Sequence, residues 1–187
     1  MQDVDVANQA LALIGQDPIV GLDDDTTISN RVALFFSVER DATLRDHPWN
    51  FAIARKTLAV SITAPVAGFA YAYPRDPDDL RILNVNEDKD LKWQVEGRNI
   101  VTDESTCVVK YIRRVTNPDE WDATFASAFS LRLASKLALA IAHLPELGRE
   151  LLNQYLMLLM DAQSIDGQEQ GAQDSLYGAT LVDVRGL

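Results

Sequence analysis

The sequence predicts an α+β fold, in which a helical bundle carries an inserted small antiparallel β-sheet and an extended C-terminal tail. Two short N-terminal helices are expected in residues 1–47 and two long C-terminal helices in residues 117–167, because apolar residues recur there at helical spacing. In residues 48–116 apolar and polar residues alternate, which is typical of half-buried strands. Residues 168–187 are polar and glycine-rich and predict the tail. A chain of 187 residues suffices for a single unit with its own core.

The N-terminal helices follow from local signals. Apolar residues repeat from Val4 to Ile14, and Gly15 stands where a C-cap glycine belongs. A second helix is expected from about Thr27 to Asp46, entered through the acidic run 23–25, which suits a helix N-terminus. Three carboxylates in a row also raise the alternative of a hard metal ion. The run lacks the alternating ligands and central glycine of a calcium loop, so helix entry is the better interpretation.

The switch from helix to strand falls in residues 45–55. Pro48 stops the second helix, because the residue before a proline is pushed out of the helical region. Trp49 and Phe51 follow at once, and their spacing predicts that they wedge between the helical core and the inserted sheet. We interpret Pro48, Trp49 and Phe51 as structural anchors, and His47 as part of the hinge without a catalytic partner.

The inserted sheet is expected to hold four or five strands. Alternation predicts them at residues 57–62, 80–85, 91–95, 100–101 and 106–113. Before the second strand lies an aromatic loop bounded by prolines, 64–74. Loops this apolar are usually covered, and the cover is either the chain's own sheet or a neighbouring subunit. Phe69, Tyr71 and Tyr73 are therefore candidate partner-binding residues.

The C-terminal helices are signalled by Asn117 as an N-cap, by Pro118 at the first helical position, and by Pro145, which restarts the chain as a further helix. So short a connection predicts that the two helices lie antiparallel or sharply bent. Five apolar residues fall outside the main stripes of these helices: Leu131, Leu139, Leu156, Met157 and Met160. They predict contacts with the N-terminal helices or with other subunits.

The tail combines a polar stretch with apolar residues near its end. The default interpretation of such a terminus is disorder. The alternative is a segment that orders against a partner. On that alternative the candidate partner-binding residues are Leu176, Tyr177, Leu181, Val182 and Val184.

Charge and composition argue against several classes of protein. The formal net charge is −11, and nucleic-acid binding usually depends on Lys and Arg. Such a balance most often keeps a protein soluble, and the sharper alternative is a surface past which DNA slides without sticking. The N-terminus lacks a signal-peptide pattern and no apolar run is long enough to span a membrane, so we expect synthesis in the cytoplasm and no membrane partner.

Catalytic chemistry is not visible in the sequence. Cys107 is the single cysteine, which excludes an internal disulfide and a cysteine-based zinc site. His47 and His143 have no further ligands at metal spacing, and no phosphate loop or hydrolase motif occurs. We therefore expect no enzyme, no catalytic residues, no metal and no cofactor.

Several separate segments together resemble one protein family. They are RDHPWNFA and RKTLA at 45–52 and 55–59, GFAYAYP at 68–74, DLRIL at 79–83, VEGRNIVTDE at 95–104, and LRLA at 131–134. Their order and spacing are similar to those of tail tubular protein A, the head-to-tail adaptor of short-tailed bacteriophages and their prophages. The resemblance covers about residues 5–165.

The resemblance implies a fold and a function. Adaptors of this family have a helical bundle with a β-rich insertion, and they form a ring of twelve subunits between the portal protein and the tail nozzle protein. It implies a non-catalytic virion protein at the head-tail junction, whose partners are itself, the portal and the nozzle, while genomic DNA passes through without specific binding. The alternative is a non-catalytic interaction or regulatory module encoded by a prophage, which would need no ring.

Overall fold

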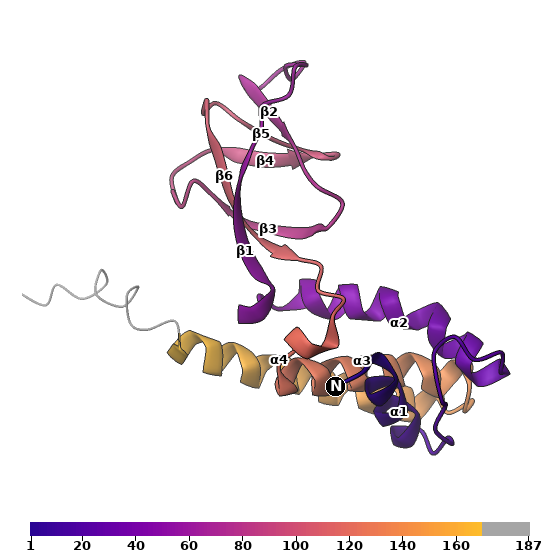
Figure 1. The fold of residues 1–187 in the computed structure, drawn as a ribbon. Helices are drawn as coiled ribbons and strands as arrows, with labels where there is room; N and C mark the ends of the chain where they lie inside the picture. The colour runs from indigo at the N-terminus through magenta and orange to yellow at the C-terminus, as the bar shows by residue number, and fades with distance from the viewer. Residues whose placement is uncertain (170–187) are drawn as a thin grey trace, which may run out of the picture.

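The computed structural model describes residues 1–169, with side chains through residue 162, and it has an α+β fold. The helices lie together as one layer, and the strands stand off one side of it (Figure 1). In chain order the elements are α1 Asp3–Leu13, α2 Thr27–Asp46, the 3-10 turn η1 Asn50–Ala52, β1 Ile53–Leu58, β2 Tyr71–Pro74, β3 Asp79–Val85, β4 Trp93–Glu96, β5 Asn99–Thr102, β6 Cys107–Arg113, the 3-10 turn η2 Pro118–Glu120, α3 Ala123–Ala140 and α4 Pro145–Glu169.

Helix α3 is the centre of the helical layer, and α1, α2 and α4 each pack against it. Its large apolar residues are therefore fully buried: Phe125, Phe129, Leu133 and Leu137. The core continues from the helices into the strands, because Leu80 and Ile112 belong to the same buried cluster. The short connection between α3 and α4 makes the two helices antiparallel. Gly148 of α4 lies so close to α3 that a β-carbon there would stand 2.9 Å from the Ser135 carbonyl oxygen.

The ends of the first two helices confirm the local signals. Gly15 has a φ of +70°, and its N–H donates to Ala12 while that of Gln16 donates to Leu11, which is the hydrogen-bond pattern of a glycine C-cap. Helix α2 has the predicted bounds, but its N-terminus is capped by the Thr26 hydroxyl, which accepts from the Ser29 N–H at 3.1 Å. Of the acidic run before it, Asp24 accepts backbone N–H groups within its own loop.

The strands form two three-stranded antiparallel sheets, with strand orders β1-β6-β3 and β2-β5-β4. The sequence predicted one sheet of four or five strands. That prediction was wrong, because the strands are divided between two sheets. The first strand lies at Ile53–Leu58 instead of 57–62, because those residues pair along β6 from Ile112 to Cys107. Tyr71–Pro74, predicted as loop, is a strand because it pairs with β5. Pairing partners far away in the sequence decided both points.

Helix α3 begins later than predicted. Asn117 does cap, but it caps the 3-10 turn η2, and Asp122 caps α3 itself by accepting from the Phe125 N–H at 2.6 Å. Between η2 and α3, Trp121 has an extended backbone. This break points the indole into the core, where its Nε1–H donates to the Val115 carbonyl at 3.2 Å.

Candidate interaction site

The predicted anchors lie where the helical layer meets the strands. Trp49 is 2% exposed, and its ring meets that of Phe125 edge-on at a centroid distance of 5.3 Å. The indole Nε1–H donates to the Thr43 carbonyl of α2 at 3.0 Å. Phe51 is half-buried and meets Phe125 from another direction, at 5.2 Å. Pro48, directly before Trp49 in the chain, is also half-buried. Trp49 and Phe51 therefore share one aromatic contact on α3.

His47 lies beside this aromatic contact. Its imidazole is 1% exposed and packs edge-on against Trp49 at a centroid distance of 4.7 Å. This environment makes His47 part of the hinge packing. His143, in contrast, is exposed in the turn after α3 and has a φ of +58°.

A network of charged groups joins α2, α3 and α4. Arg132 of α3 donates to Glu39 of α2 at 2.7 Å and also to Asp46, and it reaches the Tyr155 hydroxyl of α4 at 3.1 Å. The Tyr155 hydroxyl in turn donates to Asp46 at 2.7 Å. Burial alone would lower the pKa of Arg132, but its hydrogen bonds to Glu39 and Tyr155 and the charge of Asp46 raise it. Burial and the bond to Asp46 raise the pKa of Tyr155. Arg132 therefore stays charged at neutral pH, and its hydrogen bonds tie the three helices together.

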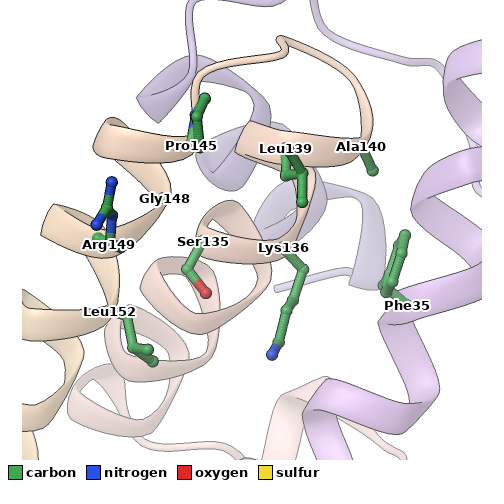
Figure 2. A pocket seen from close by; sticks show the side chains of 9 residues that line it. All are labelled: Phe35, Ser135, Lys136, Leu139, Ala140, Pro145, Gly148, Arg149 and Leu152. Atoms are coloured by element: carbon green, nitrogen blue, oxygen red, sulfur yellow. The ribbon is translucent and has the colours of Figure 1, made fainter.

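Beyond this network the space between α2 and α4 is open, and it forms a groove above α3 (Figure 2). Lys136 lies between Leu152 of α4 and Phe35 of α2, and Leu139 stands nearer the end of α3. The groove is lined by Phe35, Ser135, Lys136, Leu139, Ala140, Pro145, Gly148, Arg149 and Leu152. Leu152 is 38% exposed because it faces this groove.

Large apolar side chains of α3 and α4 are exposed. Leu139 is 61% exposed, and Leu156, Met157 and Met160 of α4 are 49%, 67% and 70% exposed. These four belong to the off-stripe set predicted to make contacts outside the helix pair. The fifth, Leu131, is half-buried and packs against the chain's own core. Four of the five off-stripe residues are therefore left exposed within the described residues.

Helix α2 adds two further exposed apolar residues that the sequence interpretation did not single out. Leu34 and Val38 are 73% and 61% exposed. They lie one helical turn apart, next to Phe35 at the groove. Both residues lie off the main apolar stripe of α2, and this is the same sequence signal that indicated the exposed apolar residues of the long helices.

The three aromatic residues of the insertion that were predicted to bind a partner differ in their exposure. Tyr73 is 1% exposed in the core between the strands, and its hydroxyl donates to the Glu104 carbonyl at 2.8 Å. That burial leaves Tyr73 no surface for a partner, so its cover is the chain's own sheet. Tyr71 is half-buried against the same core, and Phe69 is half-buried in the loop before it. The tail candidates Leu176, Tyr177, Leu181, Val182 and Val184 lie outside the described residues.

Groups for metal or nucleophilic chemistry are not assembled in the part of the chain that the structure describes. No cluster of three or more His, Cys, Asp or Glu that could hold a metal ion occurs among residues 1–169. Cys107 is a free, fully buried thiol, and burial raises its pKa to about 11. None of the described helices is long and apolar enough to cross a membrane. The groove and its apolar surroundings are thus the feature with the clearest capacity to bind something.

Comparison with known proteins gives no assignment: no protein-family model matches the chain, and no curated protein matches it.

Proposed function

We propose that this protein is a structural head-to-tail adaptor of a short-tailed bacteriophage. In this proposal the chain assembles into a ring, of twelve subunits as in the family it resembles, between the portal and the tail nozzle of the virion. It has no catalytic activity, and genomic DNA passes through the ring without specific binding. The proposal rests on the resemblance of residues 45–59, 68–74, 79–83, 95–104 and 131–134, together with one structural observation.

That observation is the uncovered apolar surface of the helical layer. Leu34 and Val38 of α2, Leu139 of α3, and Met157 and Met160 of α4 are all more than half exposed. Contiguous exposed apolar surface marks interaction sites in soluble proteins, and the interfaces of permanent oligomers resemble a protein core cut in half. A ring subunit needs such surface on more than one face, because each copy contacts two neighbours.

The charge of the chain supports the same proposal. A net charge of −11 repels the phosphate backbone, which suits a conduit from which DNA must slide freely. The apolar tail residues 176–187 would contact the portal or a neighbouring subunit in the assembled particle. Ordering of a segment on binding is common in assembly contacts.

The test is assembly, followed by light scattering and negative-stain imaging of the purified protein with and without portal protein. We expect rings about as wide as a portal for the unaltered chain. Met160→Asp, which places a charge on the exposed apolar face, should abolish them, whereas the control Val20→Asp, at an 89% exposed position in the α1–α2 loop, should not.

A chain that stays monomeric even with portal present would overturn the adaptor proposal. That result would favour the alternative, a prophage-encoded interaction module without a ring. Rings that form equally well from Met160→Asp would remove the apolar face of α4 from the subunit contact.

A further inference from the structure

The sheet β1-β6-β3 is basic, although the chain as a whole is acidic. Its three strands carry five lysine and arginine side chains and a single carboxylate, that of Asp79. Asp79 is buried, and it is already paired with Lys56 at 2.7 Å. This sheet therefore has an excess of positive charge in a chain whose formal net charge is −11.

Three of these cations share one face of the sheet. Arg55 of β1 is the cross-strand partner of Lys110 of β6, and Arg81 of β3 is opposite Ile112, two residues further along β6. Like charges directly opposite each other on neighbouring strands are destabilising. Arg55 is paired only with Glu87, and both side chains are more than half exposed, so the pair is screened by water. Lys110 has no carboxylate partner within the described residues.

Arg45, in the last turn of α2, extends this basic surface at the foot of the sheet. Its guanidinium donates to the Leu80 carbonyl at 2.5 Å, and Arg81 donates to the Arg45 carbonyl at 3.1 Å. These bonds position both side chains without neutralising them, because neither is ion-paired with a carboxylate in the part of the chain that the structure describes. We refer to Arg45, Arg55, Arg81 and Lys110 as the basic face.

The opposite charge is concentrated at the N-terminal end of the chain. Residues 1–30 contain six carboxylate side chains and no lysine or arginine, so they account for more than half of the net charge of −11. In the α1–α2 loop Asp17, Asp23 and Asp25 are exposed, and none of them is ion-paired within residues 1–169. Asp24 differs, because it accepts backbone N–H groups of its own loop.

Helix α2 keeps the acidic loop and the basic face apart within one chain. The loop ends where α2 begins, at Thr27, while Arg45 lies in the last turn of the same helix. A helix of 20 residues is about 30 Å long, at about 1.5 Å per residue. The loop lies at one end of the helical layer, and the strands rise near the other end of α2 (Figure 1). The two charged surfaces can therefore meet only between different molecules.

We propose that the basic face of one copy docks the α1–α2 loop of a second copy, so that Asp17, Asp23 and Asp25 face its four cations. A contact between two different surfaces is heterologous, and repeating it produces a closed ring or an open filament. The contact rests on the proposed adaptor function and gives the ring a direction, with the acidic end of each subunit on the sheet of the next. Complementary charge mainly sets the orientation and the choice of partner in such contacts.

Charge reversal in the full-length chain tests the contact. The face variant combines Arg81→Glu with Lys110→Glu, and the loop variant combines Asp23→Lys with Asp25→Lys. Self-association is measured by analytical ultracentrifugation at about 0.05 M and at about 1 M NaCl, where the Debye length is about 3 Å. Circular dichroism checks the fold of each variant. Because Asp23 and Asp25 are exposed loop residues, the loop variant tests the contact even if the reversals in the sheet disturb folding.

The matched control is Lys92→Glu with Arg98→Glu. Both residues are exposed cations next to β4 and β5, outside the basic face, and the change in net charge equals that of the face variant. The control should therefore associate as the unaltered chain does, unless net charge alone decides the outcome.

We expect the face variant and the loop variant each to associate at least about tenfold more weakly than the unaltered chain at low salt, because like charges then meet. An equimolar mixture of the two, and a single chain carrying all four reversals, should recover most of the association, because opposite charges face each other again. These differences should shrink at high salt.

Association that tolerates both reversals, or that is no stronger in the fourfold variant than in the single variants, would overturn the docking and leave the adaptor proposal standing. A loop variant that self-associates normally but fails to bind portal protein would also overturn it and would assign the acidic end to the portal. An unaltered chain that stays monomeric at both salt concentrations, even with portal protein, would overturn both proposals.

Discussion

Replacing Trp49 by alanine tests whether the junction between helices and strands is held by the indole. The side chain is 2% exposed. Its ring meets Phe125 at 5.3 Å and His47 at 4.7 Å, and its Nε1–H donates to the Thr43 carbonyl at 3.0 Å. Trp49→Ala removes all of these contacts at once and leaves a cavity between α2, α3 and the strands.

The expected loss follows from that burial. Truncating a fully buried Trp to Ala costs about 3–5 kcal/mol, which combines lost transfer free energy with the cavity left behind. For a chain of this size about 1 kcal/mol lowers Tm by roughly 2–4 °C, so Trp49→Ala should lower Tm by roughly 6–20 °C. Trp49→Phe keeps an aromatic ring against Phe125 and gives up the N–H bond, and its loss should be clearly smaller.

Thermal melts followed by circular dichroism, together with urea titrations, measure both variants. Trp93 gives a matched control, because it is a half-exposed tryptophan of β4 in the other core cluster, and Trp93→Ala should cost less than Trp49→Ala. A Tm for Trp49→Ala within about 2 °C of the unaltered protein would refute the argument, because it would mean that the indole is not packed as the structure shows.

Two further predictions concern buried polar groups. Arg132→Leu leaves the buried Glu39 carboxylate without its cation, and it should lower the free energy of unfolding by about 3–5 kcal/mol. Adding Glu39→Leu to the same chain should restore much of that loss. Strictly additive losses of the two substitutions in urea titrations would contradict the pairing. Burial raises the Cys107 pKa from 9.0 to about 11, so the thiol should resist Ellman's reagent at pH 8 in the folded protein and react rapidly in urea. Because the raised pKa belongs to the folded state, its contribution to stability is present below about pH 9 and is lost as the pH rises toward 11. The urea midpoint should therefore fall over that window and fall less in Cys107→Ala; equal labelling of folded and unfolded protein would count against the buried thiol.

Local signals were enough to predict several helix boundaries of this protein. Thr27–Asp46 has the bounds that were expected, and Gly15 adopts the positive φ of a C-cap. Pro145 starts α4 as predicted. These features depend on residues within one or two turns of each other, so the sequence contains all the information that decides them.

Local signals did not predict where the strands begin and end or which strands pair. Alternation in 57–62 resembles that of a strand, but β1 lies at Ile53–Leu58 because that stretch finds its partner in β6, about fifty residues further along the chain. The same dependence on a remote partner turned the predicted loop at Tyr71–Pro74 into β2 and buried Tyr73. Trp121 delayed the start of α3 because its indole is held in the core of the folded chain.

The candidate site shows the same contrast. The sequence by itself indicated that Leu139, Leu156, Met157 and Met160 are too apolar for the outer face of a helix pair, and the structure leaves all four exposed. Only the tertiary structure placed one of them, Leu139, in a groove, because that groove is formed by α2, α3 and α4 together. Likewise only the fold brings Arg132 to Glu39, 93 residues away in the chain. Periodicity along one helix determines which face is apolar, but the packing of three helices decides whether that face is covered.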